Sequence, residues 1–179
     1  MSVAYSEYYT VEDYQQWEGD WELIYGKAYA MSPSPSYDHQ YINLKIARYL
    51  DEQLDNCPNC HAVIETDVTL SKDTVLRPDS MVICYEPEDQ LTKAPEIVFE
   101  VISKSTSKRD ELLKFDIYQN EGVKYYILVY PDSNKAKLYR LLDYKYRKIA
   151  DFTNETYDFE LDKCTIHFDF SFIWRKKQG

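Results

Sequence analysis

The chain has 179 residues, of which 44% are hydrophobic and 29% charged, as expected of a folded globular protein rather than a disordered one. Its formal charge of −10 disfavours contact with phosphate backbones unless basic side chains gather locally, and its four glycines include neither GxGxxG nor GxxxxGK[ST]. No apolar run approaches the roughly 20 residues that span a bilayer, and no secretory signal opens the chain, so we expect one cytoplasmic domain over residues 1–179.

The N-terminal half predicts alternating helices and strands. Thr10 followed three residues later by Asp13 is a capping-box pattern, which predicts a short helix. A longer segment repeats apolar residues at helical spacing, from His39 to Leu54. The expected elements are a helix at 11–16, strands at 21–25 and 28–31, a helix at 39–54, and strands at 62–70 and 81–84.

Two nearly continuous apolar runs, EIVFEVI at 96–102 and YYILVY at 125–130, predict strands covered on both faces. Between them, Ser107 and Asp110 form a second capping-box match that predicts a helix as far as Asn120, with Gly122 just after its end. Strand, helix and strand at this spacing predict a parallel crossover. The remaining residues predict added hairpins, with strands at 135–142 and 144–151 and near Ile166 and Phe172.

Glu100 is the anomaly of this pattern, because it lies inside the apolar run IVFEVI. A carboxylate in such a place changes its pKa, finds a charged partner or binds a metal ion. Glu100 is therefore a functional-site candidate. The alternatives are that it pairs with a nearby Lys or Arg, or points outward at the end of its strand.

Asp79 opens the preceding strand, because Pro78 cannot donate to a sheet ladder. The two strands are joined by a loop and can lie side by side. Two carboxylates at adjacent strand positions offer the hard oxygen ligands that Mg²⁺ prefers. Asp79 could instead cap a turn.

The helix after Glu100 carries the cations that could stabilise charge on a phosphate, Lys108, Arg109 and Lys114. Lys114 lies about two turns into this helix beside apolar neighbours. Its alternative role is a solvated helix charge paired with Asp110 at i,i+4.

Six segments in fixed order carry a family resemblance: Trp21–Gly26, Ser32–Pro35 with His39, Arg77–Asp79, Glu100–Thr106, Asp110–Lys114 and Gly122–Tyr126. In order and spacing they closely resemble the Uma-type restriction endonuclease family of the PD-(D/E)XK nuclease superfamily. The resemblance covers about residues 10–131. It implies an α/β (α+β) fold with a restriction-endonuclease-like core, in which helices flank a mixed central sheet and hairpins are added.

The resemblance also assigns roles. Asp79 and Glu100 correspond to the two acids of the motif, and Ile102 stands where the usual lysine would be. In this family that role is thought to pass to a helix lysine, here Lys114. Glu22 resembles the N-terminal acid that often completes the metal site. The residues expected to contact substrate are His39, Arg77, Lys108 and Arg109.

The resulting hypothesis is a Mg²⁺- or Mn²⁺-dependent endonuclease. Asp79, Glu100 and the Val101 carbonyl would hold the ion, which lowers the pKa of a water that attacks a phosphodiester, with Lys114 stabilising charge. The expected partner is nucleic acid, DNA before RNA, and a homodimer is expected because double-strand cleavage often uses two sites. The alternative is a non-catalytic nucleic-acid-binding or interaction domain that kept the fold, which the acidic charge and Ile102 favour.

The four cysteines are expected to be reduced, in keeping with a cytoplasmic protein. Cys57-Pro58-Asn59-Cys60-His61 matches the haem-attachment pattern, but without an export signal we expect no haem. The pair could form half of a zinc site, yet Cys84 and Cys164 stand at no recognised ligand spacing. The sequence therefore predicts a surface loop with free thiols.

Overall fold

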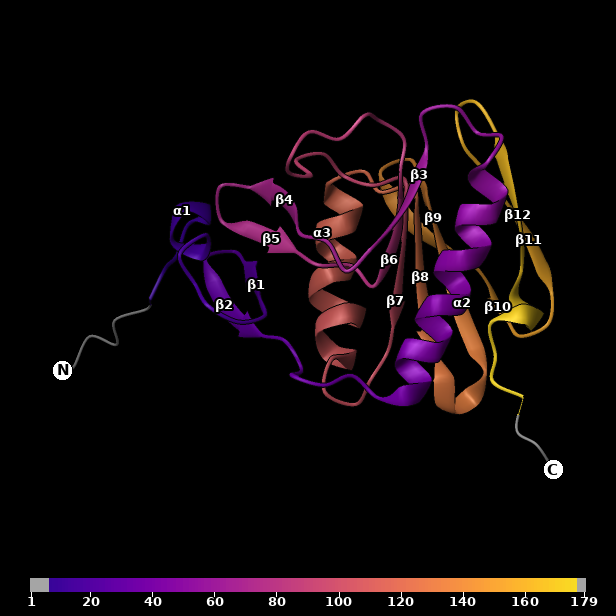
Figure 1. Cartoon of the computed structure of the whole chain (residues 1–179), viewed down its shortest axis with the longest axis horizontal. Helices are drawn as coiled ribbons and strands as arrows, with labels where there is room; N and C mark the ends of the chain where they lie inside the picture. Colours follow the sequence, from indigo (N-terminus) through magenta and orange to yellow (C-terminus); the bar gives the residue numbers. More distant parts are fainter. Residues whose placement is uncertain (1–6, 177–179) are drawn as a thin grey trace.

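The computed structural model describes residues 7–176. At their centre is a six-stranded mixed sheet with the strand order β10-β9-β8-β7-β6-β3 (Figure 1). A four-stranded sheet, β2-β1-β5-β4, and a two-stranded sheet, β11-β12, accompany it. The helices are α1 (Val11–Tyr14), α2 (Tyr37–Leu54) and α3 (Lys114–Asn120). The strands are β1 (Trp21–Ile24), β2 (Lys27–Ala30), β3 (His61–Ile64), β4 (Val68–Ser71), β5 (Thr74–Leu76), β6 (Ser80–Ile83), β7 (Ile97–Val101), β8 (Tyr125–Tyr130), β9 (Lys135–Leu142), β10 (Lys145–Phe152), β11 (Thr156–Glu160) and β12 (Thr165–Asp169).

The centre of the large sheet follows the sequence prediction. All five residues of β7 are buried, and β7 pairs in parallel with β8, which confirms the crossover. Its other neighbour, β6, is antiparallel, as are the pairs β8–β9 and β9–β10. A run of apolar residues with no polar alternation is what a strand covered on both faces requires.

The two long helices cover opposite faces of this sheet (Figure 1). On one face α2 packs against β7 and β8 together with the β11–β12 hairpin, through a cluster that includes Ile46, Phe99 and Phe168. On the other face α3 packs against the alternate side chains, with Ile117 beside Val98. Because Glu100 shares the strand parity of Val98, its side chain faces the α3 side.

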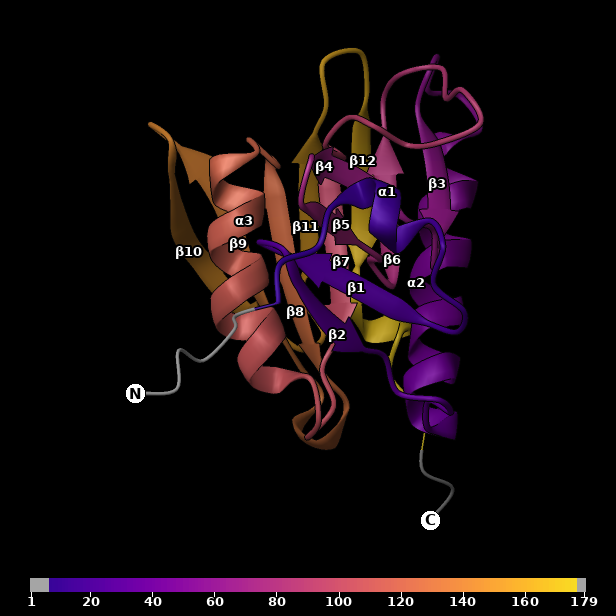
Figure 2. The ribbon, with the colours of Figure 1, turned by 90° about the vertical axis from the view of Figure 1, so that its left-hand side faces the viewer.

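The four-stranded sheet lies in front of the large sheet when the molecule is turned through 90° (Figure 2). It corrects one prediction, because residues 62–70 form two strands of two different sheets. The break falls at Glu65, whose φ of 43° is left-handed and cannot continue a strand. The short strand β5, Thr74–Leu76, was not predicted.

The C-terminal hairpins also differ in part from the prediction. Phe172 lies in a 3₁₀ turn, η3 (Phe170–Phe172), and not in a strand. The partner of β12 is β11, which precedes it and pairs with it in register. A further 3₁₀ turn, η2 (Pro131–Ser133), joins β8 to β9.

The helix after β7 contains a wide turn. Its segment η1 (Arg109–Leu113) is π-helical, and the Lys114 N–H donates to the Arg109 carbonyl, five residues back. Ser107 lies within the helical segment and does not cap it, contrary to the prediction. A π turn inserts one residue into an α-helix and is frequent at functional sites.

The prediction of free thiols is wrong, whereas the loop does lie at the surface, since Asn56, Pro58 and Asn59 are exposed. The structure pairs Cys57 with Cys164 and Cys60 with Cys84. Cys57 and Cys60 are buried, because the turn after α2 packs against the core. Within residues 7–176, no helix is both long and apolar enough to cross a membrane.

Candidate active site

Asp79 and Glu100 belong to neighbouring strands at one end of the large sheet. The antiparallel register pairs Ser80 with Phe99, so Asp79, one residue before β6, falls opposite Glu100. Directly opposed residues of an antiparallel pair project to the same face with their Cβ atoms about 5 Å apart. The Val101 N–H donates to Asp79 Oδ2 at 2.7 Å, which fixes the Asp79 carboxylate beside the β7 backbone.

Glu100 is a buried acid with polar partners on α3. Its exposed fraction is 2%, and its Oε1 atom lies 2.9 Å from Lys114 Nζ and 3.3 Å from the Tyr118 hydroxyl, which donates to it. Burial raises the pKa of Glu100 well above its ordinary value, and Lys114 opposes this rise. The neighbouring acids Asp110 and Asp79 raise the pKa further.

Lys114 lies among three buried carboxylates. Its Nζ atom is 2.8 Å from Glu22 Oε1, 2.9 Å from Glu100 Oε1 and 3.3 Å from Asp110 Oδ1. Burial would lower the pKa of Lys114, but these acids outweigh it and raise the pKa well above its ordinary value. The ammonium group therefore stays charged, and its pairing with Asp110 is buried rather than solvated.

Glu22 brings the four-stranded sheet into the cluster. It is buried in β1, and its Oε1 atom accepts a hydrogen bond from the Arg77 N–H at 2.9 Å. Its Oε2 atom accepts from Arg109 Nη1 at 3.1 Å. Arg109 is 5.1 Å from the centre of the Tyr29 ring, in a cation–π arrangement that fixes the guanidinium above the cavity.

Asp79 also contacts the first turn of α2. His39 Nε2 lies 3.3 Å from Asp79 Oδ2, while the Ser36 hydroxyl caps the helix by accepting from the His39 N–H. Burial is the largest single influence and would lower the pKa of His39, but the hydrogen bond and charge of Asp79, the hydrogen bond to Gln40 and the charge of Glu65 together outweigh it and raise the pKa. Asn43 of the same helix makes a second contact, because its Nδ2 atom donates a hydrogen bond to the Asp79 carbonyl at 3.2 Å.

These side chains line a cavity of about 490 Å³ between the two sheets. The residues predicted from sequence that line it are Glu22, His39, Arg77, Asp79, Glu100, Val101, Arg109 and Lys114. Lys108 is the exception, since it is exposed and does not line the cavity. Its position two residues after Thr106 turns it toward solvent.

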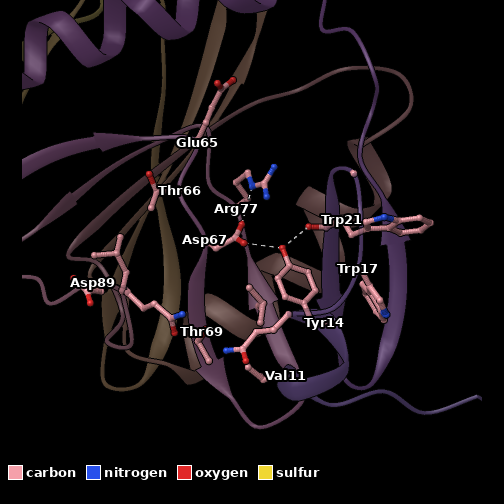
Figure 3. Close-up of a pocket in the computed structure, with 15 residues that line it drawn as sticks. Val11, Tyr14, Trp17, Trp21, Glu65, Thr66, Asp67, Thr69, Arg77 and Asp89 are labelled. Atoms are coloured by element: carbon pink, nitrogen blue, oxygen red, sulfur yellow. Dashed lines mark hydrogen bonds and ion pairs between the residues drawn. The ribbon is translucent and has the colours of Figure 1, made fainter.

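Arg77, together with Glu65, lines both this cavity and a second one of about 500 Å³, which Figure 3 draws. Its Nε atom donates to Asp67 at 2.7 Å and its Nη1 atom to Asp20 at 2.6 Å. Asp67 also accepts from the Tyr14 hydroxyl at 2.8 Å, as the dashed lines show. Two acids thus already neutralise the guanidinium that the sequence assigned to substrate.

The donor set suits a divalent cation. Glu22, Asp79, Glu100 and Asp110 are four carboxylates, whereas Lys114 and Arg109 supply two permanent positive charges. Oxygen-rich clusters with an excess of negative charge are what Mg²⁺ and Mn²⁺ bind. Burial is the main cause of the raised pKa of Glu100, and the charges of Asp110, Asp79 and Glu22 raise that pKa further.

Sequence reasoning missed the roles of Asp110 and Asn43. Asp110 is 3% exposed, although it was considered only as a surface partner of Lys114. Asn43 is 4% exposed and accepts from the Ser80 hydroxyl, which ties α2 to β6. Its place on the apolar stripe of α2, one residue after Ile42, was the available signal.

A mixed sheet with helices on both faces and a buried acidic cluster at one end defines a restriction-endonuclease-like nuclease fold. The chain belongs to the Uma2 family, described as "Putative restriction endonuclease", whose pattern matches residues 11–159. Families of this class generally use a divalent metal.

A solved structure of similar fold comes from Anabaena variabilis ATCC 29413, described as a putative nuclease belonging to DUF820. The two chains superpose with a TM-score of 0.74 over 92% of this chain and 97% of that one, at 16% sequence identity. This likeness confirms the predicted fold class. Among curated proteins, none matches the chain.

Proposed function

We propose that the protein is a divalent-metal-dependent endonuclease that hydrolyses phosphodiester bonds of nucleic acid, DNA before RNA. The observation that carries the proposal is the placement of Asp79, Glu100 and Lys114 on one cavity, with both acids on adjacent strands. The family membership supports the same class of reaction.

Each residue has a role in this proposal. Asp79, Glu100 and the Val101 carbonyl would hold Mg²⁺ or Mn²⁺, which when bound lowers the pKa of the attacking water and offsets charge on the phosphate. Lys114 stabilises the negative charge that develops as the phosphodiester is attacked. Glu22 and Asp110 hold the Lys114 ammonium in position through their contacts at 2.8 Å and 3.3 Å.

The cavity rim would bind the substrate backbone. Arg109 and His39 face the cavity and can approach a phosphate without leaving their acidic partners. Since the chain carries a net charge of −10, binding depends on these local cations. Lys108 is exposed and does not line the cavity, so we leave it out of the proposed rim.

The test is cleavage of supercoiled plasmid, single-stranded DNA and RNA in Mg²⁺ or Mn²⁺. We expect Asp79→Asn and Glu100→Gln, which keep side-chain size, each to lower the cleavage rate at least about 100-fold, the scale of losing one electrostatic group of an active site. Lys108→Ala is the matched control and should cleave like wild type. Equal cleavage by wild type and both acid variants would remove the proposal.

Calorimetry with Mn²⁺ separates catalysis from the alternative of a non-catalytic domain with the same fold. An endonuclease of this design should give a binding heat that Asp79→Asn and Glu100→Gln reduce. A non-catalytic domain should give no heat that depends on these acids. The homodimer stays a prediction, and light scattering of the purified chain would check it.

A further inference from the structure

All four cysteines of the chain meet at the end of the large sheet opposite the acidic cluster. Cys57 and Cys60 lie in the turn between α2 and β3, Cys84 follows β6, and Cys164 lies in the turn of the β11–β12 hairpin. Cys84 stands five residues after Asp79 along β6, or about 16 Å away at the usual strand rise. The cluster is therefore separate from the candidate active site.

The sulfur atoms form one group rather than two distant bridges. The Sγ atoms of Cys57, Cys60 and Cys164 all lie within 4.8 Å of one another, although they belong to two different disulfides. The fourth sulfur, of Cys84, is bonded to Cys60. In a tetrahedral zinc site with Zn–S bonds of about 2.3 Å, neighbouring sulfurs are about 3.8 Å apart. The sulfurs of Cys57, Cys60 and Cys164 are therefore close enough to share one ion once the two S–S bonds are reduced, and the Cys60–Cys84 bond holds the fourth sulfur next to them.

The local backbone also suits a metal site. Cys57-x-x-Cys60 has the ligand spacing of structural zinc sites. The turn is tight, since Asn59 adopts a left-handed φ of 64° and the Cys60 N–H reaches the Cys57 carbonyl. Cys57 and Cys60 are only 6% and 8% exposed, and Cys84 and Cys164 are half-buried, so the four cysteines are largely withdrawn from solvent, as the ligands of structural zinc sites are.

We propose that, when its cysteines are reduced, the protein binds one structural Zn²⁺ through Cys57, Cys60, Cys84 and Cys164. Reduction of the two disulfides takes four electrons and four protons from two molecules of a dithiol reductant, which become disulfides. The four thiols then release four protons and bind the ion as thiolates. Four thiolates in a tetrahedron select zinc over the magnesium expected in the acidic cluster.

The site would add to the core packing that already holds the β11–β12 hairpin through the buried Phe159, Ile166 and Phe168. A two-stranded hairpin such as β11–β12 is marginally stable alone. Cys164, at its turn, is 107 residues from Cys57 in sequence, so one ion would join the hairpin to α2, β3 and β6. With both proposals, the chain would hold a zinc site of thiolate ligands at one end of β6 and a magnesium or manganese site of carboxylate ligands at the other.

The test uses the full chain, reduced with a phosphine and supplied with Zn²⁺, followed by metal analysis and thiol counting after denaturation. We expect one zinc per chain and four thiols, and Co²⁺ in place of Zn²⁺ should give thiolate-to-cobalt charge-transfer bands with a tetrahedral ligand-field spectrum. The cobalt spectrum needs no variant, so it stays decisive even if cysteine variants fold poorly.

Variants assign the ligands. Cys84→Ser and Cys164→Ser should each weaken zinc binding by at least about 10-fold. The controls His61→Ala, next to Cys60, and Glu100→Gln, in the acidic cluster, should keep the full zinc content. Fully reduced protein that takes up no zinc, takes up iron instead, or loses its zinc in Glu100→Gln would overturn the proposal.

Discussion

Lys114 is the residue on which the buried charges depend. Three carboxylates with exposed fractions of 1–3% share one ammonium group, so removing it leaves the buried Glu100 and Asp110 without the cation that they contact, while Glu22 keeps Arg109. A lysine in this place is both part of the proposed chemistry and part of the fold.

We expect Lys114→Met to lower the free energy of unfolding by about 3–5 kcal/mol, the usual cost of removing one partner from a buried ion pair. Urea denaturation of the metal-free protein would measure it. Lys108→Met, on the same helix but exposed, should change stability by no more than about 0.5 kcal/mol. A similar loss in both variants would contradict the role assigned to Lys114.

The sequence revealed Glu100 and Asp79 because each breaks a local rule, one as an acid in an apolar run and the other as an acid after a proline. Lys114 and Glu22 break no such rule. The helix after Glu100 offered Lys114 as one of three candidate cations and the family resemblance singled it out, whereas only the resemblance pointed to Glu22. Asp110 escaped because an i,i+4 pair looks the same in sequence whether it is solvated or buried, and burial comes from β1 packing over α3.

At the scale of elements, strands covered on both faces were predictable because their apolar runs are long. The break at Glu65 was not predicted, although the three consecutive polar residues Glu65, Thr66 and Asp67 interrupt the alternation where the chain changes sheets. The three-residue strand β5 pairs with β4 across a short turn and with the distant β1, and β11 pairs with β12 across another turn. Short segments with little apolar content give no signal of such pairing.

Helix α2 positions the start of β6 through Asn43. Its amide donates to the Asp79 carbonyl and accepts from Ser80, and both Asn43 and Ser80 are buried. We expect Asn43→Ala to lower the free energy of unfolding by about 1–3 kcal/mol, because the Ser80 hydroxyl would lose its buried partner. Thermal or urea unfolding would measure this loss.

Asn56→Ala, just after α2, is the control for this substitution. Asn56 is exposed, so the change should cost no more than about 0.5 kcal/mol. If Asn43→Ala lowered the free energy of unfolding equally little, the hydrogen bonds that join Asn43 to Asp79 and Ser80 would not contribute to positioning Asp79.

The whole molecule should respond to a divalent cation, because the acidic cluster joins α3, both larger sheets and the start of α2. An ion that binds only the folded state raises its stability, by about 2.7 kcal/mol at 100 times the dissociation constant. Melting temperature measured against Mn²⁺ concentration at constant ionic strength should therefore rise in wild type. Asp79→Asn should flatten this rise, and an undiminished rise in Asp79→Asn would place the ion elsewhere.

The cysteines show the limit of sequence reasoning at this scale. Two of them are three residues apart, but the other two are brought to them by β6 and by a hairpin 107 residues away. Ligand spacing in a sequence identifies sites made by one or two local segments. A site assembled by the fold from three separate segments has no such spacing.

Because of the π turn η1, the position of Lys114 depends on the number of residues in the helix before it as well as on their identity. One α-helical residue advances about 100° around the axis, so deleting a single residue between Arg109 and Leu113 would swing Lys114 away from Glu22 and Glu100. Leu112, 64% exposed, could be deleted with little loss of core packing. A relative that lacks the widened turn should therefore carry its basic residue one position away from where an ungapped alignment with Lys114 would place it.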